Sequence, residues 1–416
     1  MLDTAYLRAL TEAELVAPGG YFSGSTVWRE RGLACVELLV DAYLRRLAEF
    51  SDPERVEHPF LLPRGPYREV FPDYRNVYST RPARDHRPSW VLRPDNLDAS
   101  VRALTAAGHD GPLVAVGGLL RHFRGPVQPL FRERYIWPAV QVTHLVPAGE
   151  ALATLDRHQR ALEDFLADLA LPVVSVTTDA HPGYGVPCHL TVTCLPDGRP
   201  TVLSTSYLMS EERARALGVL DAVLDIGFTG KLLALVAGHH RDPRHLLLPS
   251  RLAPVQVGVT HQGDGQAPPE VADWLRRLAA QGVRVASTGA APLRGHRRRA
   301  ERRWLRSGAP LVVTHGRTTT LTRRLPLRRD PVDALPEDAA LRAELAASDR
   351  RLRAHTDRRF RRALWDSDLL RTVCDTCAAR HRLPVLGHLT PPRTGPCSTC
   401  SGTGAVVLVS EAGRFY

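Results

Sequence analysis

Two differently patterned parts of the sequence meet at Leu247-Leu248-Pro249-Ser250-Arg251-Leu252-Ala253-Pro254-Val255-Gln256-Val257. Before this stretch, residues 134–146 read as a strand, 148–170 as a helix, and 186–194 and 200–206 as two strands joined by a Pro-Asp-Gly turn. After it, short apolar runs at 255–259, 283–286 and 310–314 surround an amphipathic helix at 271–281. The pattern predicts a mixed, mainly antiparallel sheet with flanking helices, followed by a small α/β unit. A charged helix over about residues 339–365 then leads into the tail.

The high positive charge of the chain says little about which molecules it binds. The chain has 416 residues and a formal charge of +11, and every basic residue other than Lys231 is arginine. Isoleucine and asparagine each occur only twice, which is the composition typical of a GC-rich genome. Part of the arginine excess therefore reflects codon usage, and it is weak evidence for a polyanionic partner.

Apolar runs and the pattern of the first residues bear on where the protein is located. No apolar run approaches the roughly 20 residues that span a bilayer, and the first residues lack the basic-then-apolar order of a signal peptide. We expect a cytoplasmic protein with no membrane partner.

Four of the seven cysteines have the spacing of a metal site. They form two Cys-x-x-Cys pairs separated by nineteen residues, namely Cys374, Cys377, Cys397 and Cys400. Such pairs favour a closed, structural zinc site. Two disulfides or four free thiols are the alternatives, and a cytoplasmic chain disfavours disulfides.

An arginine-rich segment in the α/β unit is the candidate nucleic-acid surface. Its basic residues are Arg297, Arg298, Arg299, Arg302 and Arg303, with Trp304 at its end. The run suits a phosphate backbone, although a charged run is also the usual solvated face of a helix.

Several segments, taken together and in order, resemble archaeal- and eukaryotic-type prolyl-tRNA synthetase, a class II aminoacyl-tRNA synthetase. They are Trp28-Arg29-x-x-Gly32 with residues 59–63, Val91-Leu92-Arg93-Pro94, Arg132-x-Arg134-Tyr135-Ile136-Trp137, Thr205-Ser206, residues 227–232, the stretch 247–257 and the Cys₄ tail. The resemblance implies an α+β fold with three units: a class II antiparallel-sheet catalytic domain over 1–250, an anticodon-binding-type α/β domain over 251–345, and a helix with a zinc domain over 346–416. It also implies a homodimer that binds tRNA, and a reaction in which ATP, with magnesium, and a carboxylate form an acyl-adenylate.

The resemblance also implies roles for individual residues. Arg132 or Arg134 would hold the α-phosphate and Lys231 the outer phosphates. The substrate pocket would contain Asp95, Trp137, Thr205 and Tyr207. The terminal Tyr416 is either a group near the active site or a frayed end.

The chain departs from the family pattern mainly at the positions that bind the substrates in the family. The loop that carries a glutamate in the family reads Asp95-Asn96-Leu97, and the ungapped equivalents of an Arg-x-Glu pair are His122 and Arg124. Pro138-Ala139-Val140-Gln141 replaces a Gln-Glu-Gly-His segment, and Lys231 replaces the arginine that clamps ATP. A point-charge ammonium is no equivalent of a planar guanidinium fork at such a clamp.

Three functional readings follow. The leading one is a diverged paralogue that uses ATP to activate an amino acid or related carboxylate and transfers it to tRNA, a carrier protein or a small-molecule amine. The alternative is a non-catalytic tRNA-binding or regulatory paralogue. We rank a housekeeping prolyl-tRNA synthetase last.

Overall fold

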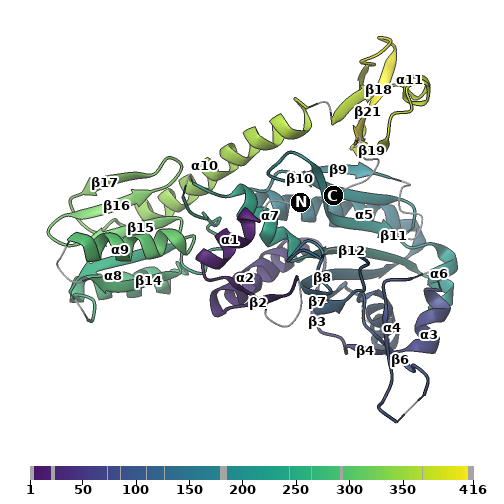
Figure 1. Ribbon diagram of the computed structural model, residues 1–416, viewed down its shortest axis with the longest axis horizontal. Coiled ribbons are helices and arrows are strands. Elements are labelled where there is room, and N and C mark those ends of the chain that lie inside the picture. Colours follow the sequence, from purple (N-terminus) through teal and green to yellow (C-terminus); the bar gives the residue numbers. More distant parts are fainter. Residues whose placement is uncertain are drawn as a thin grey trace.

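The computed structural model describes residues 4–19, 24–72, 74–84, 86–108, 110–125, 127–178, 185–242, 244–263, 265–290, 294–367 and 369–410 (Figure 1). Tyr416 lies outside these residues, and so does the side chain of Arg297. Among the helices described, none combines the length and apolar character needed to cross a membrane.

A large, mostly antiparallel sheet forms the body of the protein. Its strand order is β18-β21-β19-β9-β10-β11-β12-β8-β7-β3, with β20 paired to β21. The strands are β3 (Glu54–Val56), β7 (Leu113–Leu120), β8 (Tyr135–Val146), β9 (Val174–Thr177), β10 (Cys188–Cys194), β11 (Pro200–Leu208), β12 (Ala222–Thr229), β18 (Leu370–Val373), β19 (Val385–Thr390), β20 (Thr394–Pro396) and β21 (Thr403–Val409). Only the β3–β7 pair is parallel. The predicted antiparallel sheet is confirmed.

Helices pack on the sheet and differ in how much of their surface is buried, from a single residue in α6 to nearly all of α7. The helices of this part are α1 (Ala5–Glu12), α2 (Glu30–Leu47), α3 (Arg64–Val70), α4 (Leu97–Ala107), α5 (Ala151–Asp168), α6 (Glu211–Ala216) and α7 (Lys231–His239), with a 3₁₀ turn, η1 (Ala148–Glu150). Along α2, Val36, Leu39, Val40 and Tyr43 recur at helical spacing and are buried. They pack in one core cluster with residues of α1, α5, α7 and the sheet. Small two- and three-stranded sheets flank the body: β1 (Val16–Pro18) with β2 (Thr26–Trp28), and β4 (Leu61–Pro63), β6 (Trp90–Leu92) and β5 (Tyr78–Thr80).

The second unit is an α/β sheet with its own core. Its strand order is β14-β13-β15-β16-β17, with parallel pairing among the first three strands and antiparallel pairing among the last three. The elements are β13 (Val257–Gln262), α8 (Pro269–Ala280), β14 (Val285–Ala290), α9 (Arg294–Arg306), β15 (Leu311–His315), β16 (Thr319–Arg323) and β17 (Arg328–Val332). Trp304 of α9 is buried against Gly258, where a Cβ atom would lie 2.3 Å from the indole. This tryptophan therefore belongs to the core and is not part of an exposed binding surface.

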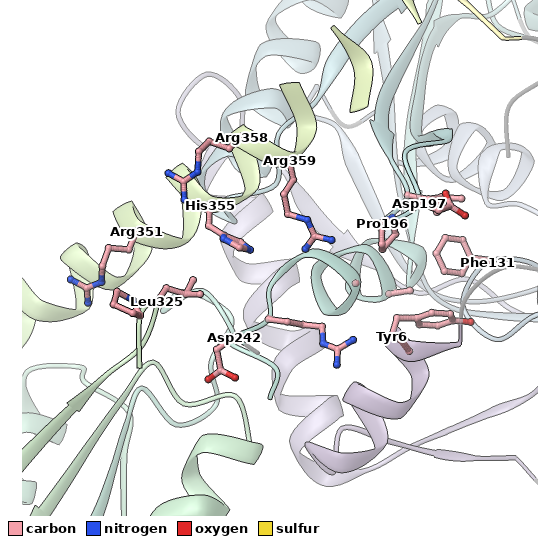
Figure 2. A pocket seen from close by; sticks show the side chains of 16 residues that line it. Tyr6, Phe131, Pro196, Asp197, Asp242, Leu325, Arg351, His355, Arg358 and Arg359 are labelled. Carbon is pink, nitrogen blue, oxygen red and sulfur yellow. The ribbon is translucent and has the colours of Figure 1, made fainter. Parts of the chain in front are cut away.

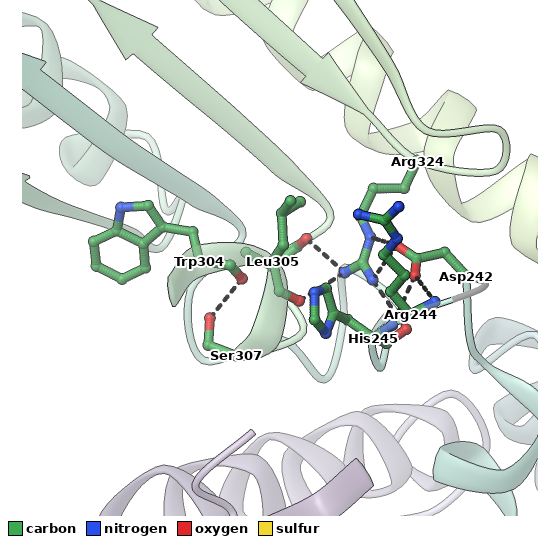
Figure 3. Close-up of polar contacts among 8 residues, drawn as sticks. Asp242, Arg244, His245, Trp304, Leu305, Ser307 and Arg324 are labelled. Carbon is green, nitrogen blue, oxygen red and sulfur yellow. Dashed lines mark hydrogen bonds and ion pairs between the residues drawn. The ribbon is translucent and has the colours of Figure 1, made fainter. Parts of the chain in front are cut away.

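A buried ion pair joins the two units. The Arg324 guanidinium, directly after β16, donates to Asp242 Oδ2 from Nε at 2.9 Å and from Nη2 at 2.7 Å (Figure 3). It also donates to the carbonyls of Leu305, Ala309 and His245 at 3.1 to 3.3 Å. Burial raises the pKa of Asp242, but the Arg324 charge and two backbone N–H groups outweigh it and hold the pKa below its usual value.

The tail continues the main sheet. Helix α10 (Asp338–Leu364) runs from the five-stranded sheet across the body to the tail, which also contains α11 (Asp375–Arg380) (Figure 1). There β19 pairs with β9, with His388 opposite Thr177. The sequence predicts a third unit over residues 346–416; in the structure, their strand β19 pairs with β9 and so extends the main sheet.

Candidate active site and metal site

A cavity of about 290 Å³ opens on the main sheet between β8, β11 and β12. It is lined by five of the residues that the sequence singled out: Asp95, Trp137, Thr205, Tyr207 and Lys231. They come from distant parts of the chain and meet because β11 pairs with β12 and β12 with β8.

Buried acidic and amide groups form one part of the cavity. Asp225 Oδ1 accepts a hydrogen bond from Gln141 Nε2 at 2.8 Å, and Gln141 Oε1 accepts from the backbone N–H of Asn96 at 2.8 Å. Burial raises the pKa of Asp225 to about 7, and the charge of Asp95 adds to this, against the hydrogen bonds from Gln141 and Tyr207.

Asp95 is held at the start of α4. Its Oδ1 accepts from the Leu97 N–H at 3.2 Å, and its Oδ2 accepts from the Tyr67 hydroxyl at 3.4 Å. Burial raises its pKa, while the positive charge of Arg121 opposes that rise. Two carboxyl groups, Asp95 and Asp225, thus line one cavity, and a substrate ammonium group would offset the cost of ionising both.

Cationic groups line the same cavity. Lys231, at the start of α7, donates from Nζ to the Val202 carbonyl at 2.5 Å, and Nζ lies 5.7 Å from the Phe131 ring centroid. Burial lowers the pKa of Lys231 to about 7. Arg121 and Arg213 also line the cavity; Arg121 donates from Nε to the Pro94 carbonyl at 2.7 Å.

The arginines predicted to hold the α-phosphate are placed differently. Neither Arg132 nor Arg134 lines the cavity, whereas Glu133 between them does. Arg132 is exposed and donates to the Arg124 carbonyl at 2.8 Å.

Sequence reasoning missed Arg121, Gln141, Arg213 and Asp225. One signal was available for Asp225, which is the single charged residue in the apolar strand Ala222–Thr229. A charge is rarely buried in such a strand without a partner. That Gln141 lies beside Asp225 follows only from the pairing of β8 with β12, in which Gln141 stands opposite Gly227, two residues from Asp225.

The four tail cysteines converge as predicted. Their Sγ atoms all lie within 4.8 Å of one another, and the Sγ atoms of Cys374 and Cys400 are 3.7 Å apart. That separation is far beyond a disulfide bond of about 2.05 Å. Ligands at about 2.3 Å from a tetrahedral zinc ion lie about 3.8 Å from each other. The cluster could therefore hold a metal ion, and the donor set fits zinc.

The arginine-rich segment is helix α9. Arg298, Arg299, Arg302 and Arg303 are exposed on it, while Glu301 is buried and accepts from Thr322 Oγ1 at 2.9 Å and from Arg329 Nε at 2.7 Å. The helix thus presents a basic outer face.

The comparisons with known proteins agree with this fold. No protein-family model matches the chain. A curated proline–tRNA ligase from Haloarcula marismortui is 26% identical over 171 residues, a match that covers 37% of this chain and 34% of that relative. The chain thus matches about a third of the length of its curated relative.

Solved structures match along nearly the whole chain. The prolyl-tRNA synthetase of Cryptosporidium parvum, complexed with L-proline and AMP, has a TM-score of 0.78 at 16% identity, covering 99% of this chain and 97% of that one. That of Giardia lamblia, in complex with prolyl-adenylate, has a TM-score of 0.79 at 15% identity with the same coverage. The chain therefore has the fold of a prolyl-tRNA synthetase.

Proposed function

We propose that this chain uses ATP to activate an amino acid, or a related carboxylate that carries an amine, and transfers the acyl group to an acceptor. In the first step a carboxylate oxygen attacks the α-phosphorus of ATP and pyrophosphate leaves. In the second, the acceptor attacks the acyl carbon and AMP leaves. The acceptor is tRNA, a carrier protein or a small-molecule amine.

One observation carries the proposal: three carboxyl groups, those of Asp95, Glu133 and Asp225, and three cationic side chains line the same cavity. Asp225 and Asp95 are suited to the substrate ammonium group, because a buried carboxylate binds a cation strongly. Arg121, Arg213 and Lys231 are suited to the phosphates, whose negative charge they would offset. Magnesium would accompany ATP and neutralise part of its phosphate charge.

The positions of the arginines change which residue we expect to contact the α-phosphate. We assign contact with the α-phosphate to Arg121, because it lines the cavity and Arg132 and Arg134 do not. Catalysis would rest on positioning and on charge neutralisation.

The second candidate is a non-catalytic tRNA-binding protein, and the state of Lys231 favours it. At neutral pH an amine with a pKa of about 7 carries only part of its charge, and its Nζ is already held by the Val202 carbonyl. Such a group is a weak clamp for ATP. The exposed arginines of α9 would bind the RNA backbone without any reaction in the sheet cavity.

ATP–pyrophosphate exchange separates the two candidates. Activation predicts exchange that depends on one or a few amino acids. Asp225→Asn should weaken this exchange by raising the amino acid KM, whereas Asp221→Asn, which changes an exposed aspartate at the end of the loop before β12, should leave it unchanged. Salt-sensitive tRNA binding with no exchange, lost in Arg299→Ala/Arg302→Ala, would support the second candidate.

Two further assignments belong to the proposal. Zinc held by the four tail cysteines would stabilise the tail and take no part in the chemistry, because four thiolates leave no open position. A homodimer is expected from the resemblance and is tested by light scattering.

A further inference from the structure

A second cavity, of about 790 Å³, lies where α1, α7, α10 and the β10–β11 turn meet (Figure 2). Phe131 is the one lining residue that it shares with the sheet cavity. The second cavity is therefore a neighbour of the candidate active site and not part of it.

The charges that line this second cavity do not balance. Arg241 of the segment after α7, and Arg351, Arg358 and Arg359 of α10, all line it, together with His355. In Figure 2, Arg359 and His355 extend from α10 toward the side on which Tyr6, Phe131 and Pro196 lie.

The two acidic residues of the lining are already paired. Asp197 binds Arg199 at 2.6 Å, and Asp242 binds Arg324 at 2.7 Å. Within the part of the chain that the structure describes, none of the four lining arginines forms an ion pair. The lining therefore contains four arginines and two aspartates, each aspartate being paired with an arginine outside the lining, and its net charge is positive.

Donor groups of these arginines are also available. Arg351 donates from Nε to the Arg324 carbonyl at 3.3 Å, but its buried Nη2 has no hydrogen-bond partner among the described residues. Arg359 makes only a long contact, 3.5 Å from Nη1 to the His239 carbonyl. The Arg359 guanidinium, which extends toward Tyr6, Phe131 and Pro196 (Figure 2), therefore retains N–H groups that an anion in the cavity would accept.

The opposite wall is apolar and aromatic. Tyr6 and Phe131 meet edge to face, with ring centroids 5.1 Å apart, and Pro196 lies on the same side of the cavity (Figure 2). A flat or apolar group would pack there while an attached phosphate meets the arginines.

We propose that this second cavity is a binding site for a phosphorylated small ligand with a flat apolar part, of the nucleoside phosphate class. Its volume is in the range of small-molecule sites. An adjoining cavity of about 860 Å³ shares His355, Arg358 and Arg359 and adds Arg362 and Arg371, so a longer phosphate chain could extend along α10.

Calorimetric titration with ADP tests the proposal. The titration is done on the Lys231→Met variant, in which nucleotide binding in the sheet cavity should be weakened, so that binding in the second cavity can be measured. In that background ADP should still bind, and Arg241→Met/Arg359→Met should weaken the binding by more than tenfold, since each charge-assisted hydrogen bond accounts for roughly 10- to 100-fold in affinity. Inorganic pyrophosphate should compete with ADP. Arg361→Met, an exposed arginine of α10 outside both cavities, is the matched control and should bind ADP as its parent does.

Two results would overturn the proposal: no ADP binding at millimolar concentration in the Lys231→Met background, or binding that Arg241→Met/Arg359→Met changes by less than twofold. Thermal unfolding of each variant verifies that it is folded. Because pyrophosphate exchange on the wild-type protein reports the sheet cavity alone, the two proposals can fail independently.

Discussion

Replacing Arg324 with methionine should loosen the junction between the two units. The guanidinium is fully buried, forms two hydrogen bonds to Asp242 and donates to the carbonyls of Leu305, Ala309 and His245. Removing one partner of a buried ion pair costs about 3 to 5 kcal/mol, because the other charge stays buried. The N–H groups of residues 244 and 245 still donate to Asp242 Oδ1 at 2.8 and 2.7 Å, which favours the lower end, about 3 kcal/mol.

Urea unfolding followed by tryptophan fluorescence measures this cost. Arg323→Met is the matched control, since its ion pairs with Asp330 and Glu344 involve partly exposed groups and should contribute about 1 kcal/mol or less each. The double variant Arg324→Met/Asp242→Asn should be more stable than Arg324→Met, because the uncompensated charge is gone. A loss below about 1 kcal/mol for Arg324→Met, equal to that of the control, would refute the reasoning.

Three further predictions concern the two candidate sites. Asp225→Asn should raise the amino acid KM in pyrophosphate exchange roughly 10- to 100-fold and leave the KM for ATP nearly unchanged; an equal effect on both would show that Asp225 does not bind the amine. Burial holds the pKa of Asp225 and of Lys231 at about 7, so the carboxylate gains its charge and the amine loses its charge as the pH rises from roughly 6 to roughly 8. The amino acid KM should then fall and the ATP KM rise over that range, and Lys231→Arg should remove the rise, whereas an unchanged ATP profile in Lys231→Arg would contradict it. Cys377→Ser should lose the bound metal, measured by elemental mass spectrometry, and unfold the tail at lower temperature; a full metal content in this variant would exclude the Cys₄ site.

Local elements were predictable because their signals lie within short windows. Strand β10 follows from the alternation of apolar and polar residues over 188–194, and the turn to β11 follows from Gly198, whose φ of 91° suits glycine. Helices α5 and α8 follow from their apolar spacing. The tail was different: β19 pairs with β9, about 200 residues earlier, and nothing within either segment identifies that partner.

Residues of the candidate site could be predicted where they belong to a sequence motif of the family. Asp95, Thr205, Tyr207 and Lys231 stand at positions matched by the resemblance, and the structure brings them into one cavity. Asp225 could not be assigned in this way, because its partner Gln141 becomes its neighbour only when β12 lies beside β8.

Arg132 and Arg134 could not be placed from the motif alone. The resemblance identified an arginine-bearing hairpin, but this segment precedes β8 and is not regular strand, so the sequence does not fix which side chain enters the cavity. Glu133 lines the cavity, and its pKa is raised by burial to about 7 in spite of the hydrogen bond from Thr26.

The most direct test of the proposed function is ATP–pyrophosphate exchange by the wild-type protein with each amino acid in turn, at millimolar ATP and magnesium. If the sheet cavity activates an amine-bearing carboxylate, label from pyrophosphate enters ATP with at least one of them and remains at background without any. Background exchange with every amino acid, together with no ATP binding by calorimetry at the same concentration, would contradict the proposal.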